Sequence, residues 1–129
     1  MIPIAKPYLT ADEAQAAYDT ILTGWITQGP KVAEFEKKFA EYTGAKYAVA
    51  VSNCTTALHL AMIVAGVEAG DEVICPSMSY VATANSIKYV GAKPVFAEVN
   101  PVTYNLDVED AERKITRKTK AILLVHQIG

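Results

Sequence analysis

Short apolar runs rich in β-branched residues alternate with helical stretches through most of the sequence, and this alternation limits the possible folds more than any other feature. The apolar runs cover residues 47–51, 72–75, 94–99 and 121–125, and the helical stretches cover residues 55–65, 79–90 and 108–115. Such runs are typical of parallel strands that are buried on both faces and joined by helices. The order therefore predicts an α/β fold with a mostly parallel sheet flanked by helices.

The N-terminal part of the chain precedes this alternation and indicates two helices. Thr10 and Glu13 have the spacing of a capping box, which starts a helix, and Gly24 provides its end. The second helix begins near Pro30, a favoured residue of the first turn, and ends before Gly44. Both helices place their apolar residues at helical spacing, so each has one face to bury.

We expect two parts in the chain, a helical segment over residues 1–45 and the first part of an α/β domain over residues 46–129. The helix over residues 55–65 is apolar on almost every face. A helix of this kind is covered on both sides, here by the sheet and by another layer or subunit. The last apolar run is followed by four residues only, whereas a buried parallel strand leads into a further crossover. We therefore expect the front part of a larger, oligomeric protein.

Composition and charge exclude several classes of protein. Hydrophobic residues make up 51% of the chain and charged residues 20%, which excludes a disordered chain. The net charge of −2 and the lack of a basic stripe argue against binding to nucleic acid. No apolar run approaches the roughly 20 residues of a membrane span, and no signal-peptide pattern opens the chain. The two cysteines, Cys54 and Cys75, fit neither a disulfide framework nor a zinc site, so we expect reduced thiols in a cytoplasmic protein without a metal.

Small polar residues follow the first apolar run, where an open α/β sheet binds its ligands. Cys54, Thr55 and Thr56 stand at the start of a helix, where free backbone N–H groups and two hydroxyls favour an anion such as phosphate. The alternative is that Ser52 or Asn53 only caps the helix. The thiol of Cys54 is also a minor candidate for a nucleophile, although no partner base is evident.

Two further residues belong to the same edge of the expected sheet. Tyr80 lies on the first turn of the helix over residues 79–90, which Ser79 can cap. A tyrosine at this position can stack on a flat ring whose phosphate is bound at Thr55, or it can pack on its neighbours. His126 follows the last apolar run and is either a structural hydrogen-bonding residue or a residue of the site.

Six blocks along the chain, in this order and at this spacing, resemble one family. The blocks are residues 24–30 (GWITQGP), 51–60 (VSNCTTALHL), 70–74 (GDEVI), 76–85 (PSMSYVATAN), 91–96 (GAKPVF) and 119–122 (TKAI). They are similar to the DegT-type (StrS-like) sugar aminotransferases, which have the aspartate aminotransferase-like fold of pyridoxal 5'-phosphate (PLP) enzymes. The resemblance implies a homodimeric enzyme that uses PLP to transfer an amino group from an amino acid, usually glutamate, to a nucleotide-linked keto sugar.

The resemblance also implies roles for individual residues. The cofactor-binding residues of this chain are then Cys54, Thr55, Thr56, Tyr80 and His126. In that family the loop around Thr55 holds the cofactor phosphate, the aromatic residue at Tyr80 stacks on the pyridine ring, and His126 lies close to the cofactor. The family usually has glycine where Cys54 stands, so the phosphate loop of this chain departs from the family pattern at that position.

The stretch around the single tryptophan matches a part of the family that lies near the sugar nucleotide. The residues that match are Trp25, Ile26 and Thr27. Packing of the N-terminal helices against one another is an equally good explanation for these side chains.

The family's own catalytic residues lie beyond residue 129. They are the lysine that forms a Schiff base with the cofactor and the aspartate that pairs with the pyridine nitrogen. We therefore assign no catalytic residue to this chain and expect residues 1–129 alone to be inactive, although the parent protein is an enzyme. Two alternatives remain: a PLP-dependent deoxysugar dehydratase of the same family, with histidine in place of the lysine, and a non-catalytic or regulatory protein that retains the fold.

Overall fold

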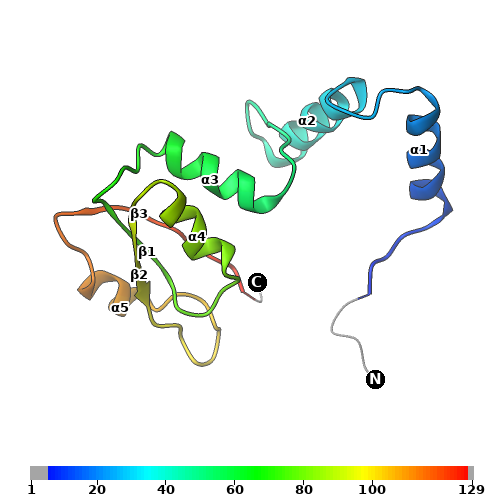
Figure 1. Cartoon of the computed structure of the whole chain (residues 1–129). Coiled ribbons are helices and arrows are strands. Elements are labelled where there is room, and N and C mark those ends of the chain that lie inside the picture. Colours follow the sequence, from blue (N-terminus) through cyan, green and yellow to red (C-terminus); the bar gives the residue numbers. More distant parts are fainter. Residues whose placement is uncertain (1–5, 128–129) are drawn as a thin grey trace. The chain divides into compact units, whose positions relative to one another are not determined.

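A computed structural model describes residues 6–127 (Figure 1). The chain divides into two compact units, Met1–Ala50 and Val51–Gly129. The elements of the first unit are α1 (Ala11–Leu22) and α2 (Pro30–Thr43). The elements of the second unit are α3 (Cys54–Val64), β1 (Glu72–Pro76), α4 (Ala82–Tyr89), β2 (Lys93–Ala97), α5 (Val108–Arg113) and β3 (Thr119–Ile122).

Both N-terminal helices form where the sequence predicts them. The side chain of Thr10 accepts a hydrogen bond from the backbone N–H of Asp12, and the carboxylate of Glu13 accepts one of 2.6 Å from the backbone N–H of Thr10. This is the expected capping box, which satisfies donors that the first turn leaves free. Gly44 ends α2 with a φ of 72°, a left-handed conformation that glycine adopts without strain. No residue of α1 or α2 is buried, so their apolar faces remain open.

The expected first strand, over residues 47–51, is not formed, and this prediction was wrong. A strand needs a neighbouring strand to pair with, and none lies beside this segment among residues 6–127. Instead the backbone N–H of Ala50 donates a 2.8 Å hydrogen bond to Oε1 of Glu36 on α2. The side chains of Tyr47 and Val49 are exposed.

The second unit is built on a three-stranded parallel sheet with the order β2-β1-β3. Ile74 of the central strand pairs with Val95 on one side and Ile122 on the other, and the backbone N–H of Leu123 donates a 2.8 Å hydrogen bond to the carbonyl of Ile74. The predicted strands over residues 72–75, 94–99 and 121–125 are thus confirmed. The last two end earlier than predicted, at Ala97 and Ile122. Because β1 has neighbours on both sides, it is the best-buried element of the sheet.

Helices cover both faces of the sheet (Figure 1), and the side chains of β1 alternate between two cores. On the face of α3 and α4, the core consists of Met62, Val67, Val73, Cys75, Ile87 and Ala92. On the face of α5, it consists of Ile74, Ala97 and Ala111. Burial on both faces explains why β1 is apolar throughout rather than alternately polar.

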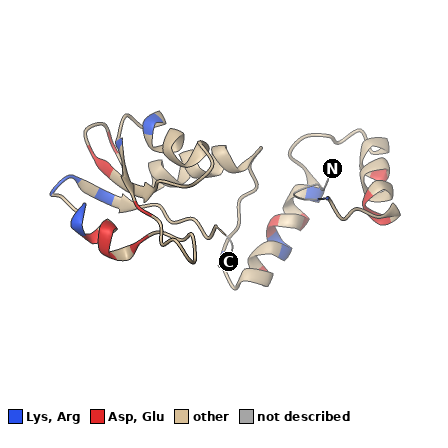
Figure 2. Cartoon of the chain, turned by 90° about the horizontal axis from the view of Figure 1, so that it is seen from below, with Lys and Arg blue, Asp and Glu red and all other residues tan. Residues whose placement is uncertain are grey.

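One side of α3 remains without a covering layer. Met62 is buried against the sheet, whereas Leu60, Ile63 and Val64 are exposed. The helix contains no Asp, Glu, Lys or Arg, and Figure 2 shows the charged residues of this unit on other segments. Within the second unit, residues 51–127 therefore do not supply the second covering layer that the sequence predicts. Within residues 6–127, no helix combines the length and the apolar character that crossing a membrane requires.

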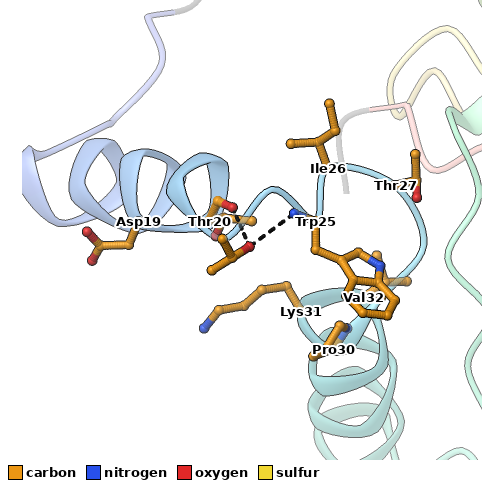
Figure 3. A pocket seen from close by; sticks show the side chains of 10 residues that line it. Asp19, Thr20, Trp25, Ile26, Thr27, Pro30, Lys31 and Val32 are labelled. Atoms are coloured by element: carbon orange, nitrogen blue, oxygen red, sulfur yellow. Dashed lines mark hydrogen bonds between the residues drawn. The ribbon is translucent and has the colours of Figure 1, made fainter.

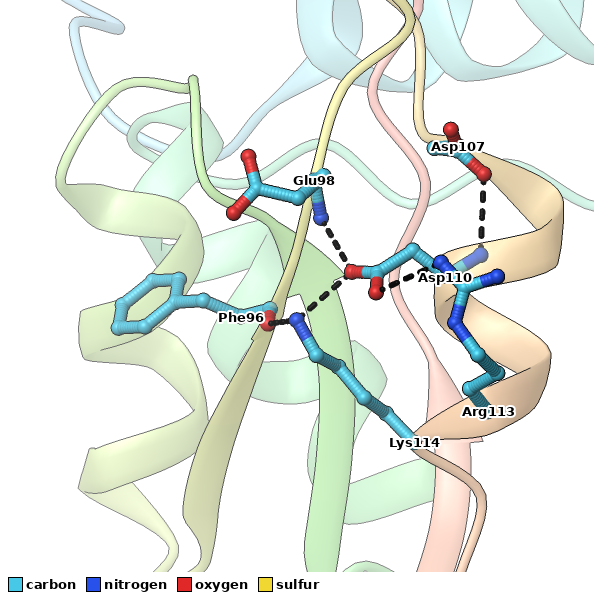
Figure 4. Close-up of polar contacts among 6 residues, drawn as sticks. All are labelled: Phe96, Glu98, Asp107, Asp110, Arg113 and Lys114. Carbon is cyan, nitrogen blue, oxygen red and sulfur yellow. Dashed lines mark hydrogen bonds and ion pairs between the residues drawn. The ribbon is translucent and has the colours of Figure 1, made fainter.

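A network of charged side chains attaches α5 to the sheet (Figure 4). Asp107 caps α5 by accepting a 2.9 Å hydrogen bond from the backbone N–H of Asp110. The carboxylate of Asp110 accepts hydrogen bonds from the backbone N–H of Glu98 at 2.8 Å and from Nζ of Lys114 at 2.7 Å. The same Nζ donates to the carbonyl of Phe96, the residue before the last of β2. These contacts lower the pKa of Asp110 from its ordinary value of 3.8 to about 2, and the hydrogen bond from Lys114 has the largest effect.

Candidate functional site

The start of α3 is shaped by Asn53, which is the N-cap of the helix. Its side-chain oxygen accepts a 2.9 Å hydrogen bond from the backbone N–H of Thr56. The same oxygen accepts a bond of 3.2 Å from the hydroxyl of Thr56, and Oγ of Ser52 lies 3.2 Å from that hydroxyl. Asn53 is therefore the cap, one of the two candidates that the sequence offered, and the hydroxyl of Thr56 is used within the loop.

Capping by Asn53 leaves other donors at the start of α3 free. The backbone N–H groups of Cys54 and Thr55, and the hydroxyl of Thr55, have no hydrogen-bond partner among residues 6–127. Free N–H groups on the first turn carry the positive end of the helix dipole. The junction can thus still offer an anion three donors in addition to its cap.

Tyr80 lies just before α4, and the helix begins later than the sequence predicts. The N-cap is Val81, without a side-chain hydrogen bond, so the prediction that Ser79 caps this helix was wrong. Ser79 instead bonds to Thr83 by its hydroxyl, at an Oγ–Oγ1 distance of 2.6 Å. The side chain of Tyr80 is 79% exposed, which leaves one face of its ring available to a ligand.

A cavity of about 250 Å³ lies beside Tyr80, at the end of β1 and the beginning of α4. Its lining residues are Pro76, Ser77, Ser79, Tyr80, Val81, Thr83, Ala84 and Phe96. The sequence did not single out Thr83 or Phe96 for this site. Phe96 belongs to an apolar run whose sequence is typical of a buried strand. In the structure, β2 pairs with β1 so that Phe96 lies at the end of β1, where it lines the cavity.

The helices α3 and α4 bring the two halves of the candidate site to one end of the unit. They pack against each other and run in the same direction in Figure 1. His59 of α3 and Tyr89 of α4 form an edge-to-face contact with ring centroids 5.5 Å apart, which fixes their alignment. Thr55 precedes His59 by one helical turn, and Tyr80 precedes the whole of α4, so both lie toward the N-terminal ends of the helices.

His126 follows β3 and extends toward the same edge, since parallel strands end on one side of a sheet. It is exposed, and no hydrogen bond links its side chain to residues 6–127. The neighbouring backbone N–H of Gln127 donates a 3.2 Å hydrogen bond to Oδ1 of Asn105, which holds this end of the chain to the loop before α5.

The two cysteines are free and differ in their surroundings. Cys54 is exposed on the first turn of α3, whereas Cys75 is buried near the C-terminal end of the central strand β1. Burial raises the pKa of the Cys75 thiol to about 11, so this thiol is unreactive at neutral pH. Within residues 6–127, no three His, Cys, Asp or Glu side chains come together in a way that could hold a metal ion.

Trp25, Ile26 and Thr27 line a separate cavity of about 450 Å³ in the first unit (Figure 3). The indole Nε1 of Trp25 donates to the carbonyl of Gln28. A side chain on Gly29 would collide with the indole, because an added Cβ would overlap Nε1 of Trp25. The loop is therefore built around Trp25, and it retains open space that a ligand can enter.

The residues at the edge of the second unit fit a phosphorylated aromatic cofactor. The free donors of Cys54 and Thr55 suit a phosphate, and the exposed ring of Tyr80 suits a flat heterocycle. Neither residues 52–56 nor residues 76–85 include a carboxylate that would repel the phosphate. The arrangement holds and orients such a group but supplies no basic side chain of its own within those two segments.

Comparisons with known proteins show that the chain is similar to enzymes named for reactions of nucleotide-linked sugars. GDP-perosamine synthase of Caulobacter vibrioides is 47% identical over 129 residues, which cover 99% of this chain and 35% of that protein. UDP-4-amino-4-deoxy-L-arabinose--oxoglutarate aminotransferase of Shewanella sediminis is 43% identical over 128 residues, 99% of this chain and 33% of that protein. This chain thus spans about a third of the length of these relatives.

Solved structures show the same likeness. The PMP form of the putative sugar aminotransferase Spr1654 from Streptococcus pneumoniae matches with a TM-score of 0.91 and 40% identity, over 98% of this chain and 32% of that one. This match confirms the predicted fold class, a parallel sheet flanked by helices as in PLP aminotransferases. The family model for the DegT/DnrJ/EryC1/StrS aminotransferases matches residues 7–129. The chain belongs to the DegT/DnrJ/EryC1/StrS aminotransferase family.

Proposed function

We propose that the chain is the N-terminal part of a PLP-dependent aminotransferase that transfers an amino group from glutamate to a nucleotide-linked keto sugar. In this proposal residues 1–45 are a helical segment, and residues 46–129 are the first part of the cofactor-binding domain. The observation that carries it is the pairing of free donors at the start of α3 with the exposed ring of Tyr80 at the start of α4.

The names of the relatives support both the reaction and the class of substrate. The Shewanella protein is named as an aminotransferase that acts between an amino sugar nucleotide and oxoglutarate, the keto acid formed from glutamate. The Caulobacter protein is named as a synthase of a GDP-linked sugar. The structure from Streptococcus pneumoniae is described as the PMP form of a sugar aminotransferase, and PMP is the aminated state of PLP.

Each residue of the site has a distinct task in this proposal. Bound PLP would supply an electron sink for the reaction at the amino-acid carbon. The backbone N–H groups of Cys54 and Thr55 and the hydroxyl of Thr55 bind its phosphate, while Thr56 keeps the loop in shape. Tyr80 covers one face of the ring and excludes water from it. His126 stands at the same edge and completes the set of proposed cofactor-binding residues.

The first unit has the task of binding the sugar nucleotide. The cavity lined by Trp25, Ile26 and Thr27 is large enough for part of such a substrate. Trp25 is half-exposed, so its indole can stack on a base or a sugar ring while its Nε1 remains bonded to Gln28.

The proposal includes a homodimer in the cytoplasm. Exposed apolar side chains on α2 in the first unit, and separately on α3 in the second unit, support an assembly, because an apolar helix face is covered in stable proteins. These side chains are Phe35, Phe39, Tyr42, Leu60, Ile63 and Val64. The free thiols of Cys54 and Cys75 support a reducing compartment.

The proposal is tested with the purified full-length protein, PLP, glutamate whose amino nitrogen is isotope-labelled, and a set of nucleotide-linked keto sugars. We expect 2-oxoglutarate to form and the label to appear in an amino sugar nucleotide, as measured by mass spectrometry. A dehydrated sugar without the label would identify the dehydratase of the same family. Binding without any turnover would favour the non-catalytic protein.

A further inference from the structure

Two hydrogen bonds converge on Thr83 from the segment that carries Tyr80. The hydroxyl oxygens of Ser79 and Thr83 lie 2.6 Å apart, and the backbone N–H of Thr83 donates a 3.0 Å bond to the carbonyl of Tyr80. The residue before Tyr80 and the backbone of Tyr80 itself are thus both bonded to one threonine. A backbone segment held at two successive residues has little freedom to rotate.

Thr83 is itself fixed by the core of the unit. It is buried, and its carbonyl accepts a 2.9 Å hydrogen bond from the hydroxyl of Ser86, which is completely buried. The N-cap of α4, Val81, has no side-chain hydrogen bond. The pair of hydroxyls therefore connects the loop before α4 to a buried residue of the helix.

The ring of Tyr80 depends on this backbone for its position. With 79% of its surface exposed, the side chain has few packing partners of its own among residues 6–127. If the backbone that carries this ring is mobile, the protein binds a heterocycle beneath the ring less tightly. The reason is that the conformational freedom of the backbone is lost on binding. The Ser79–Thr83 pair is the contact that removes this freedom in advance.

We propose that Thr83 is a positioning residue whose hydroxyl, bonded to Ser79, holds the Tyr80 ring ready to stack on the cofactor. The proposal rests on the proposed function, since it takes the ligand to be the pyridine ring of PLP. Thr83 does not itself touch the ring in this account. Its effect passes through the backbone of residues 79–83.

The test uses the full-length protein with three variants. Thr83→Val keeps the shape of the buried side chain and removes the hydroxyl, Thr83→Ser keeps the hydroxyl, and Ser79→Ala removes the partner. Hydrogen exchange over residues 77–83 is measured in the cofactor-free protein, and PLP affinity is measured by titration. A fourth variant combines Ser79→Ala with Thr83→Val, so that a double-mutant cycle isolates the contact.

We expect Thr83→Val to speed exchange in this segment and to weaken PLP binding about three- to tenfold, the effect of one ordinary hydrogen bond. Thr83→Ser should restore both, and the double variant should be no weaker than either single one. Faster exchange in Thr83→Val with unchanged PLP affinity would overturn the positioning role, as would additive effects in the cycle. If the wild-type protein binds no PLP, the proposed function fails and takes this role with it.

Discussion

The side-chain oxygen of Asn53 accepts a 2.9 Å hydrogen bond from the backbone N–H of Thr56, and this contact separates two kinds of donor at the start of α3. The N–H of Thr56 serves the fold. The N–H groups of Cys54 and Thr55 have no acceptor among residues 6–127 and are left for a ligand. In the proposed function, stability and cofactor binding therefore depend on different atoms of the same loop, so substitutions should separate the two effects.

Replacement of Asn53 tests this separation. Asn53→Ala should lower the free energy of unfolding by about 1 kcal/mol, because the N-cap bond is lost. Asn53→Asp should keep that stability, yet it should weaken PLP binding because a carboxylate then stands beside the phosphate. Urea denaturation and PLP titration of the full-length protein measure the two effects. Equal PLP affinity in Asn53→Asp and the wild type would place the phosphate elsewhere.

Substitution of Tyr80 tests the stacking of the ring. Tyr80→Ala should weaken PLP binding by about 1–2 kcal/mol, whereas Tyr80→Phe should have almost no effect, because the aromatic face and not the hydroxyl makes the contact. The dissociation constants come from titration of the cofactor-free protein. Equal losses in both variants would assign the effect to the hydroxyl, and no loss in either would exclude stacking.

The two thiols should react in a fixed order. Cys54 is exposed, whereas Cys75 is buried with its pKa raised to about 11, so a thiol reagent at neutral pH should label Cys54 alone in the native protein. Bound PLP should slow that labelling, since its phosphate covers the start of α3. Mass spectrometry of the labelled peptides gives both results, and Cys54→Ser is the control that should remove the label. Labelling of Cys54 at the same rate with saturating PLP would contradict the proposed phosphate site.

The network around Asp110 predicts how stability depends on pH. Its pKa is about 2 in the folded protein and 3.8 ordinarily, so its contribution is fully present above about pH 4. That contribution is lost as the pH falls from about 4 to about 2. Asp110→Asn should lower stability at neutral pH and flatten this acid dependence, while Glu109→Gln on the same helix should do neither. Denaturation midpoints between pH 2 and pH 7, measured for all three proteins, check the prediction; parallel curves for the wild type and Asp110→Asn would refute it.

Local signals in the sequence were enough to predict most of the helices. The capping box of Thr10 and Glu13 and the glycine after α2 each act through neighbours within a few residues, so their patterns can be recognised without the fold. The three paired strands were also found, because each contains a short apolar run typical of parallel strands, and β1 is in addition buried on both faces.

Features that depend on distant partners were missed. Residues 47–51 have the composition of a strand, but a strand forms only beside another, and Glu36 takes the backbone N–H of Ala50 instead. The cap of α4 was missed for a different reason, since the hydroxyl of Ser79 bonds to that of Thr83, only four residues away, and does not cap the helix. Of the candidate site, the residues on the α3 loop and Tyr80 were predicted, whereas Phe96 emerged only from the register of two strands.

The central claim is that the start of α3 binds the phosphate of PLP, and comparison of PLP with pyridoxal, which lacks the phosphate, tests it most directly. Both compounds are titrated into the cofactor-free full-length protein and into Thr55→Val, with Thr55→Ser as the control that keeps the hydroxyl. We expect PLP to bind at least about tenfold more tightly than pyridoxal in the wild type, and this ratio to shrink in Thr55→Val and recover in Thr55→Ser, because a hydrogen bond to a charged group contributes roughly 1.5–3 kcal/mol. The same ratio in all three proteins, or no preference for PLP, would contradict the account.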